Sequence, residues 1–334
     1  MREPSFWWRA PGLQPSPLAT LLAPLAALYG AVAARRMRWP GERAQVRVVC
    51  LGNLTVGGAG KTPAAITVAR MLQAAGAKPA FLTRGYGGRL AGPVVVAPSH
   101  AAAEVGDEPL LLARVATTIV ARDRRVGARA AQAAGADVIV MDDGFQNPAL
   151  AKDLSLIMVD GRRGIGNGRV VPAGPLRAPL AAQIARAGAL VVVGAAGPSA
   201  QRAIDAARAA DLPVLGARLV PDPAALAALA HRSVLAYAGI ANPEKFFATL
   251  RAAGINVEAT QPFADHQRLR GGEAADLIAR AEKMKLSLVT TEKDHARMAG
   301  EAALAALAAR STTLPVRLEF DDVAAVKRLM QKAE

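Results

Sequence analysis

A glycine-rich turn constrains this chain more than any other stretch, because it stands between a strand-like run and a helix-like run. The strand-like run, Val46–Leu54, is rich in β-branched residues, and T-V-G-G-A-G-K-T-P follows it directly. Glycines let backbone N–H groups crowd around phosphate oxygens, and a helix N-terminus favours an anion. The sequence therefore predicts a phosphate-binding loop made of Thr55, Val56, Gly57, Gly58, Ala59, Gly60, Lys61 and Thr62.

Two residues at the end of this loop indicate ATP with Mg²⁺ as the cofactors. Lys61 can reach the β and γ phosphates, and the Thr62 hydroxyl can bind Mg²⁺. The common pattern G-x-x-x-x-G-K-[ST] has glycine where this chain has Thr55, so a purely structural turn is an alternative. A ParA-like ATPase loop is a second alternative, but it needs a lysine where this chain has Val56.

Strand-like and helix-like runs alternate from the glycine turn to about residue 212. This alternation predicts an α/β domain with a mostly parallel sheet. The expected strands are Val46–Leu54, Lys78–Tyr86, Val94–Ala97, Thr117–Arg122, Asp137–Met141, Leu154–Asp160 and Leu190–Gly194, and the expected helices include Thr62–Ala75, Pro109–Val115, Arg125–Ala134 and Ala200–Ala210.

The pattern changes near Pro213, where a second, smaller α/β lobe is expected. Two strands, Pro213–Val220 and Leu314–Phe320, flank this lobe and are expected to pair as a two-stranded hinge ribbon. Between them the sequence predicts strands at Ser233–Ala241, Asn256–Pro262 and Leu286–Thr291, with helices from Pro243 and over Glu273–Lys285. The predicted divisions are residues 1–40 (membrane-associated), 41–212 (nucleotide-binding), 213–320 (smaller lobe with linker strands) and 321–334 (C-terminal helix).

An apolar run near the start of the chain, Leu18–Ala34, is interrupted by Pro24 and followed by Arg35, Arg36, Arg38 and Trp39. At 17 residues (34 − 18 + 1) it is shorter than the roughly 20 that span a bilayer. A helix packed on the protein's own surface is one interpretation. The flanking tryptophans and arginines favour a membrane-associated helix, with arginines on lipid phosphates. The basic cluster lies on the wrong side of the run for a signal peptide.

The formal net charge of +14 also indicates an acidic partner, or a composition rich in arginine. No aromatic residues interleave with a basic stripe, and no helix-turn-helix or zinc-finger spacing occurs, so nucleic acid is not the expected partner. A membrane surface or a phosphorylated substrate fits better. The single cysteine, Cys50, excludes internal disulfides and is expected to be a buried, inert thiol.

Carboxylates that follow strands are the candidate metal ligands. Asp142 and Asp143 end the hydrophobic run D-V-I-V-M, which is the Walker B arrangement for Mg²⁺, although an Asp-Asp-Gly turn can simply cap a strand. Asp107 and Glu108 stand where a loop enters a helix and should open on the same edge of the sheet. Capping is the alternative for them.

Further polar residues follow other strands or stand in rigid loops. Arg84 and Tyr86 follow the strand after the glycine-loop helix, and Arg177 stands in P-A-G-P-L-R-A-P. Each arginine could meet an anion or only shape a turn. Asp265-His266 follows a strand of the second lobe, and Thr290–Asp294 ends another, where nucleotide contact and helix capping both remain open.

The ordered motifs LGNLTVGGAGKTP, TRGYGG, GDEP, MDDGFQ, PAGPLR, FADHQ and TTEKD resemble the tetraacyldisaccharide 4'-kinase family of lipid A biosynthesis. The resemblance runs from the N-terminal apolar segment to about residue 320, and Thr55 is ordinary for that family. It implies an ATP- and Mg²⁺-dependent kinase that phosphorylates the 4'-hydroxyl of a tetraacyldisaccharide 1-phosphate to form lipid IVA. It also implies a peripheral or monotopic location on the cytoplasmic face of the bacterial inner membrane.

The resemblance carries roles onto particular residues. Lys61 and Thr62 match the family's loop, Asp107 its catalytic aspartate and His266 the histidine paired with that aspartate. Asp142 and Asp143 match its metal-side acids; Glu108 and Arg177 match its cleft, with Glu108 taken as a further metal ligand and Arg84, Tyr86 and Arg177 as substrate-binding. Two departures are Ala178, where the family commonly has glutamate, and His295 after T-T-E-K-D. The competing function is a membrane-associated P-loop ATPase that switches a partner without phosphorylating lipid.

Overall fold

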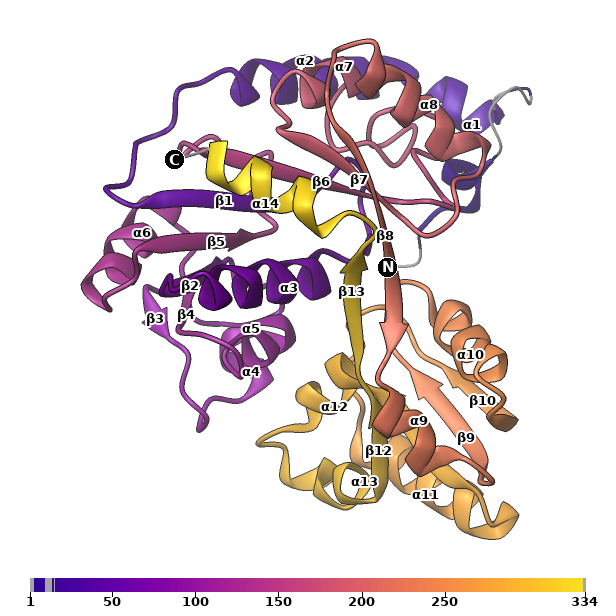
Figure 1. Cartoon of the computed structure of the whole chain (residues 1–334). Helices are drawn as coiled ribbons and strands as arrows, with labels where there is room; N and C mark the ends of the chain where they lie inside the picture. The colour runs from indigo at the N-terminus through magenta and orange to yellow at the C-terminus, as the bar shows by residue number, and fades with distance from the viewer. Residues whose placement is uncertain (1–2, 10–13, 15, 333–334) are drawn as a thin grey trace.

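The chain forms two α/β lobes joined by a ribbon of two strands (Figure 1). The computed structural model describes residues 3–9, 14 and 16–332. Within these residues, nine strands form one sheet and four form another. The predicted pair of lobes with a two-stranded linker is therefore present.

The large sheet has its phosphate-loop strand, β1, near its centre. Its strand order is β13-β8-β7-β6-β1-β5-β2-β4-β3, and β3 and β13 at the two edges run antiparallel to their neighbours. The remaining pairings are parallel. The strands are β1 Arg47–Asn53, β2 Pro79–Thr83, β3 Val94–Val95, β4 Thr118–Val120, β5 Val138–Asp142, β6 Leu154–Asp160, β7 Ala189–Val193, β8 Val214–Pro221 and β13 Val316–Phe320.

Helices cover both faces of the large sheet, which is why its strands are apolar without alternation. Along β1, Val48 and Cys50 join one apolar cluster, whereas Val49 and Leu51 join the other. The first face is covered by α2 Ala23–Met37, α6 Arg124–Ala133, α7 Leu180–Ile184 and α8 Pro198–Arg208, and the second by α3 Lys61–Ala74, α5 Asp107–Leu112 and α14 Val323–Lys332. Cys50 is buried and free, as expected, and burial raises its pKa to about 11.

The small sheet is parallel, in the order β10-β9-β11-β12. Its helices also lie on both faces. The elements of this lobe are β9 Ser233–Ala238, β10 Asn256–Pro262, β11 Ser287–Thr291, β12 Ser311–Leu314, α9 Pro223–Leu229, α10 Pro243–Ala252, α11 Gly271–Met284, α12 Glu292–Met298 and α13 Ala305–Arg310.

The ribbon between the lobes forms as predicted, with one correction. β8 and β13 pair antiparallel, from Val316 opposite Pro221 to Phe320 opposite Ala217. The expected single strand Leu314–Phe320 is wrong, because Pro315 separates β12 of the small sheet from β13. Proline has no N–H to continue a ladder. β8 also pairs with β7, so the ribbon is continuous with the large sheet.

Other boundaries differ from the prediction for local reasons. β2 ends at Thr83, short of Tyr86, since Gly85 has φ +69° and turns the chain. Several short helices were not predicted, among them η1 Ser5–Trp8, α4 Ala102–Val105, α7, α9, α12, η2 Ala302–Leu304 and α13. The predicted C-terminal helix is α14, which packs on the large sheet; residues 333–334 of that prediction lie outside the described residues.

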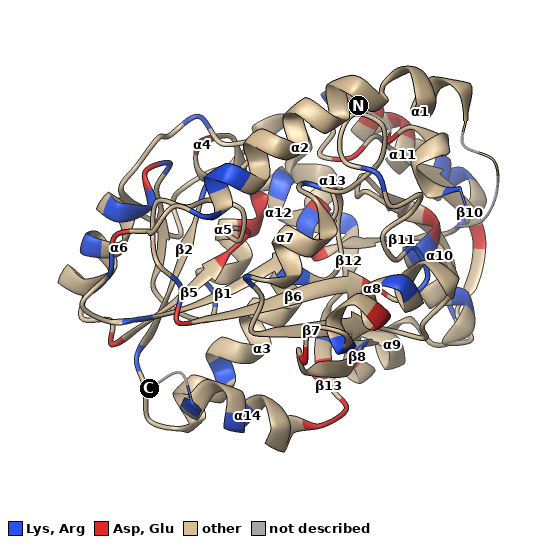
Figure 2. Ribbon diagram, turned by 90° about the horizontal axis from the view of Figure 1, so that it is seen from above, with Lys and Arg blue, Asp and Glu red and all other residues tan. Residues whose placement is uncertain are grey.

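The N-terminal apolar run forms two helices, α1 Pro17–Leu21 and α2, and Pro24 stands in the first turn of α2. α2 buries Ala26, Gly30 and Met37 on its inner side. Its other side exposes large apolar residues, and Figure 2 draws the helix tan along most of its length and blue at one end, where Arg35 and Arg36 lie. In the described part of the chain, no helix is both long and apolar enough to cross a bilayer. Residues 1–2, 10–13 and 15 of the predicted N-terminal segment lie outside the described residues.

Candidate active site

The glycine loop leaves the carboxyl end of β1 and enters α3 at Lys61. Gly57 and Gly60 have φ values of +97° and +82°, which side chains of L-residues rarely tolerate. The Val56 N–H donates to the Pro175 carbonyl at 2.8 Å, so the loop is fixed against the rigid proline segment. The local conformation is the one that a phosphate cradle needs.

Lys61 lies in this cradle and faces Asp143, which follows β5, a neighbour of β1 in the sheet. Its Nζ is 3.8 Å from Asp143 Oδ2 and also donates to the Gly57 carbonyl at 3.4 Å. Arg177 holds the same acid with two bonds, of 2.8 and 3.2 Å, and donates to the Thr55 carbonyl. Burial raises the pKa of Asp143, but the two cations outweigh it and keep its pKa below the usual range.

Asp142 and Thr62 are the residues best placed to hold Mg²⁺. Thr62 Oγ1 donates to Asp142 Oδ2 at 3.2 Å, whereas buried Asp142 Oδ1 has no hydrogen-bond partner among the described residues. Burial, followed by the charge of Glu108, raises the pKa of Asp142 to about 7. A cation would satisfy that oxygen and stabilise the charged carboxylate.

The Thr62 hydroxyl and the Asp142 carboxylate fit a Mg²⁺ ion whose remaining ligands are phosphate oxygens and water. No group of three or more His, Cys, Asp or Glu side chains gathers into a metal site in the described ranges. Mg²⁺ usually takes one or two carboxylates and leaves its other positions to water and substrate phosphates. Thr62 and Asp142 meet that requirement.

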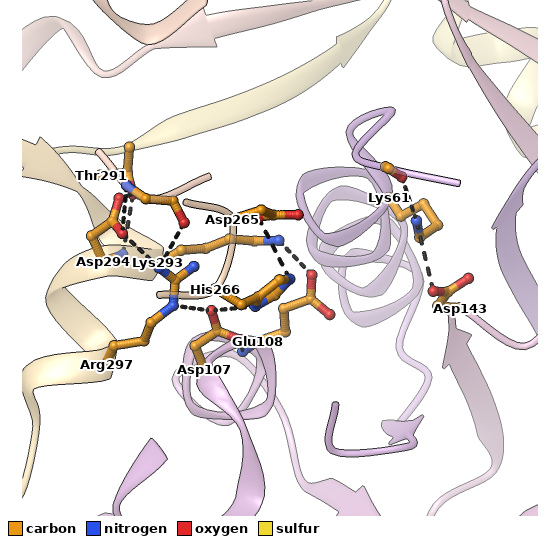
Figure 3. A network of polar contacts seen from close by, with 12 residues as sticks. Lys61, Asp107, Glu108, Asp143, Asp265, His266, Thr291, Lys293, Asp294 and Arg297 are labelled. Atoms are coloured by element: carbon orange, nitrogen blue, oxygen red, sulfur yellow. Dashed lines mark hydrogen bonds and ion pairs between the residues drawn. The ribbon is translucent and has the colours of Figure 1, made fainter. Parts of the chain in front are cut away.

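A second polar cluster joins the lobes around Asp107 (Figure 3). Asp107 is the first residue of α5, and its Oδ2 lies 3.4 Å from His266 Nδ1 and 2.7 Å from Arg297 Nε. His266 follows β10 with φ +55°, and its N–H donates to the Gly239 carbonyl. A positive φ on a non-glycine residue is strained, and it is retained here where the ring meets Asp107.

The charges in this cluster reinforce one another. Burial raises the pKa of Asp107, but His266, Arg297 and Lys293 outweigh it and hold the pKa below its usual range. The hydrogen bond from Asp107 in turn raises the pKa of His266. The result is an ionised carboxylate beside an imidazole that binds a proton readily, which is a pair suited to receiving a hydroxyl proton.

Glu108 connects the two clusters through its charge. Glu108, on α5 of the large lobe, forms an ion pair with Lys293 of α12, and this ion pair crosses the lobe interface. Its charge nevertheless opposes ionisation of Asp142 and favours the protonated form of Lys61. Of the predicted metal ligands, Thr62 and Asp142 are in direct contact, whereas Glu108 is paired with Lys293.

A cavity of 220 Å³ opens beside Asp107, between the lobes. Tyr86 is 65% exposed at this cavity, and its ring meets that of His266 edge-on with centroids 5.0 Å apart. Arg84, predicted with Tyr86, is exposed and makes no ion pair or side-chain hydrogen bond with the described residues. The lining residues include Tyr86, Asp107, His266, Arg268, Arg297 and Leu304.

Arg297 is the site residue that the sequence interpretation missed. Its guanidinium bonds Asp107, Asp294 and the Gly239 carbonyl, each at 2.7 Å, and its Nη2 has no described partner. The available signal was helical spacing, since Arg297 stands three and four residues after Asp294 and Lys293 of the T-T-E-K-D motif.

The structure also accounts for the rest of that motif and for the two departures. Thr291 caps α12, because its side chain accepts a hydrogen bond from the Asp294 N–H. Of the two alternatives for this motif, helix capping is the one that the local contacts show. His295 Nε2 lies 3.2 Å from the Ala308 carbonyl, within the small lobe. Ala178 is fully buried in the large core, and its carbonyl accepts from Gln183 Nε2 at 2.7 Å.

Known proteins similar to this chain include members of one kinase family. A family model described as tetraacyldisaccharide-1-P 4'-kinase matches residues 18–334. Relatives named tetraacyldisaccharide 4'-kinase from Rhodopseudomonas palustris (strain BisA53) and Methylobacterium sp. (strain 4-46) are 54% and 56% identical to it. Those alignments cover 99% and 98% of this chain, and 95% and 96% of the relatives.

A solved structure agrees in fold. The crystal structure of "apo" form LpxK from Aquifex aeolicus in complex with ATP matches with a TM-score of 0.71 and 24% sequence identity. The match covers 95% of this chain and 99% of that one. At this level of identity, the likeness establishes the shared architecture.

Proposed function

Because the chain belongs to the tetraacyldisaccharide-1-P 4'-kinase family, we propose that it transfers the γ-phosphate of ATP to the 4'-hydroxyl of tetraacyldisaccharide 1-phosphate. The chain is an ATP-dependent kinase of lipid A biosynthesis, and the product of this transfer is lipid IVA. The observation that carries the residue-level proposal is the position of Asp107, at a cavity between the lobes and within the lobe that bears the phosphate loop.

The phosphate loop and its cations would hold the triphosphate. Lys61 and the backbone N–H groups of residues 57–62 would bind the β and γ phosphates, and Arg177 would add positive charge beside Asp143. Mg²⁺, held by Thr62 and the Asp142/Asp143 pair, would neutralise phosphate charge when bound. Phosphoryl transfer needs mainly such positioning and charge neutralisation.

Asp107 would receive the proton of the acceptor hydroxyl. The hydroxyl oxygen forms a bond to the γ-phosphorus, the bond from that phosphorus to the β,γ-bridging oxygen breaks, and ADP leaves. The low pKa of Asp107 suits a loose transition state, in which the proton moves late and the carboxylate mainly orients the hydroxyl. His266 would share the proton through its contact with Asp107.

The cavity beside Asp107 would receive the terminal sugar of the acceptor. Tyr86 is exposed there and offers an apolar ring face, on which sugar C–H groups commonly pack. Because Asp107 and His266 belong to different lobes, we propose that movement about the β8–β13 ribbon completes this site. The lobe divisions at about residues 41–212 and 213–320 are part of this proposal.

The α1–α2 pair would place the enzyme on a membrane. Leu21, Leu25, Leu28 and Val32 are more than half exposed, and Arg35 and Arg36 follow them. Such a surface suits an anionic bilayer, and the cytoplasmic face of the bacterial inner membrane supplies one. The partners in this proposal are therefore the acylated disaccharide and the lipid surface, without nucleic acid.

A transfer assay tests the proposal directly. The protein is incubated with γ-labelled ATP and detergent-dispersed tetraacyldisaccharide 1-phosphate, and label is followed in lipid and in free phosphate. The kinase should label the lipid. Free phosphate without labelled lipid would instead support a membrane-associated ATPase and overturn the kinase assignment.

A further inference from the structure

A basic pocket of 310 Å³ lies on the side of the large lobe opposite to the glycine loop. Arg43, which lines it, precedes β1, and Ser155, also in its lining, is the second residue of β6. β1 and β6 are parallel neighbours, and the glycine loop follows the carboxyl end of β1. The pocket therefore extends from the amino ends of these strands to Phe145, on the face of the large sheet that α2 covers, whereas α3, which follows the glycine loop, covers the other face.

Three cations line this pocket, and no acid does. They are Arg43, Lys152 and Arg186, and none of them forms an ion pair with a described residue. The neighbouring acids in sequence are engaged elsewhere. Glu42 pairs with Arg129, and Asp153 accepts from the Val48 N–H. The pocket is thus a concentration of positive charge without its own counter-ion.

Lys152 is the most enclosed of the three cations. Its ammonium group is partly buried and donates to carbonyl oxygens, those of Asn147 and Leu150. Burial lowers the pKa of Lys152, and the neighbouring charges of Arg124 and Arg186 lower it further. A bound anion would offset both effects.

The pocket adjoins the membrane-directed helix. Met37, the last residue of α2, and Trp39 line it, and Trp39 is 56% exposed. Tryptophan is enriched at the level of lipid head groups, where its ring spans the apolar and polar zones. The exposed apolar side of α2 would enter the lipid while this pocket lay at head-group level.

We propose that the Arg43–Lys152–Arg186 pocket binds the phosphate group of an anionic membrane lipid, at a site separate from both ATP and the acceptor sugar. The inference rests on the proposed membrane association of α1–α2, and it does not depend on which hydroxyl receives phosphate. Phosphate is favoured because arginine and lysine together match its oxygens. A lipid source is favoured over a soluble one because the pocket borders the exposed apolar helix.

Vesicle partition tests the proposal. Binding of the full chain is compared on phosphatidylcholine vesicles with and without phosphatidylglycerol. Phosphatidylglycerol should increase the partition coefficient of the wild-type protein, and this increase should be roughly 30-fold smaller in the R43Q/R186Q variant, because two cations beside the anionic surface are removed. Binding to pure phosphatidylcholine should be unchanged, which also reports that α1–α2 remains folded.

The matched control is R280Q/K283Q, which removes two exposed cations from α11, at the other end of the molecule (Figure 1). It should keep the phosphatidylglycerol gain. If the phosphatidylglycerol-dependent increase in binding falls equally in both variants, or does not fall in R43Q/R186Q, the proposed lipid-phosphate site is wrong. Saturable binding of labelled glycerol phosphate without vesicles, lost in R43Q/R186Q, would identify a soluble phosphate ester and overturn the lipid source.

Turnover on detergent-dispersed acceptor separates this result from the kinase proposal. R43Q/R186Q should turn over at the wild-type rate there, because neither arginine contacts the Asp107 or Lys61 cluster. An inactive wild-type protein would overturn the kinase while leaving the partition result standing. A detergent-phase turnover loss confined to R43Q/R186Q would overturn the assignment of a site separate from the reaction.

Discussion

The two polar clusters of the site are built in different ways. The Lys61 cluster lies within one lobe, where Lys61, Asp142, Asp143 and Arg177 all follow strands of one sheet or stand in a loop packed against it. The Asp107 cluster crosses between lobes, and the ion pair of Asp107 with Arg297 joins residues 190 positions apart in sequence. In the proposed function, the first cluster would hold its ligand with residues of one lobe, whereas the second needs residues of both lobes.

This difference predicts that ATP binding and phosphoryl transfer are separable. In the proposed function, ATP binds to the large lobe, and the acceptor hydroxyl meets Asp107, which His266 and Arg297 contact. A substitution in the interlobe cluster should therefore act on turnover, and one in the glycine loop should act on both. The predictions below test that separation, beginning with the largest effect.

Asp107→Asn should lower kcat by about 10²–10⁴-fold, because the amide cannot accept the hydroxyl proton. ATP affinity should stay near wild type. Asp265→Asn, an exposed neighbour of His266, is the control and should lose little. Single-turnover transfer and equilibrium binding of ATP measure the two quantities, and wild-type turnover in Asp107→Asn would remove Asp107 from this role.

Lys61→Met should lower transfer by about 10²–10³-fold, the usual cost of removing one donor to developing charge. Unlike Asp107→Asn, it should also weaken ATP binding, since Lys61 lies in the phosphate cradle. Calorimetric titration with ATP makes the comparison, with Lys283→Met as a surface control. Unchanged ATP affinity in Lys61→Met would contradict the proposal that the Lys61 cluster binds ATP while the Asp107 cluster acts on the acceptor hydroxyl.

Arg297→Met should reduce kcat by roughly 10–100-fold through misplacement of Asp107. Arg297 lowers the pKa of Asp107, so its removal should raise that pKa and move the acid limb of the kcat profile to higher pH. Arg297→Lys should restore part of the rate, since lysine keeps the charge but cannot make all three bonds. An unshifted acid limb in Arg297→Met would leave Arg297 with a structural role alone.

The Asp107–His266 pair should give stability over a defined pH range. The folded pKa of His266 is raised, so its contribution is fully present below about pH 6.5 and is lost as pH rises through the folded value. The folded pKa of Asp107 is lowered, so its contribution is present above about pH 3.9 and is lost as pH falls through the folded value. The free energy of unfolding of wild type minus that of His266→Gln should therefore be largest near pH 5. A difference that grew above pH 7 would contradict this.

The smallest effect is expected at a peripheral contact between the lobes. Lys245 of α10 pairs with Asp160 at the end of β6, with 2.9 Å between Nζ and Oδ2. Lys245 is about half exposed, so Lys245→Gln should cost at most about 1 kcal/mol of stability, and less in high salt. Denaturant unfolding measures it. A large loss of turnover instead would show that this contact, and not only the Asp107 cluster, controls how the lobes meet.

The sequence was sufficient for the features that depend on local order along the chain. The glycine loop, Asp142 at a strand end and the paired strands of the ribbon each have a short-range pattern, and they form as predicted except that the second ribbon strand begins at Val316. Arg297 had no such pattern, because its position on α12 matters only once α12 meets α5 across the lobe interface. The basic pocket was missed for the same reason, since Arg43, Lys152 and Arg186 come from three separate loops.

Long-range pairing also explains why the resemblance to a known family indicated a contact that sequence spacing could not, namely the one between Asp107 and His266. Nothing between residues 107 and 266 indicates that they meet, and their pairing entered the sequence interpretation through resemblance. The structure brings them to 3.4 Å. Glu108 illustrates the limit of that route, since its partner in the structure is Lys293, a residue whose role the motif alone left open.

The β8–β13 ribbon has a consequence for how this molecule can be taken apart. The chain enters the small lobe after Pro221 and returns at Val316, directly opposite, and the Asp222 N–H donates to the Pro315 carbonyl at 2.9 Å. The small lobe is thus a cassette inserted at one point of the large one. Replacing residues 223–314 by a short turn would close the hairpin and leave a miniature ATP-binding protein, without the histidine and arginine that position Asp107.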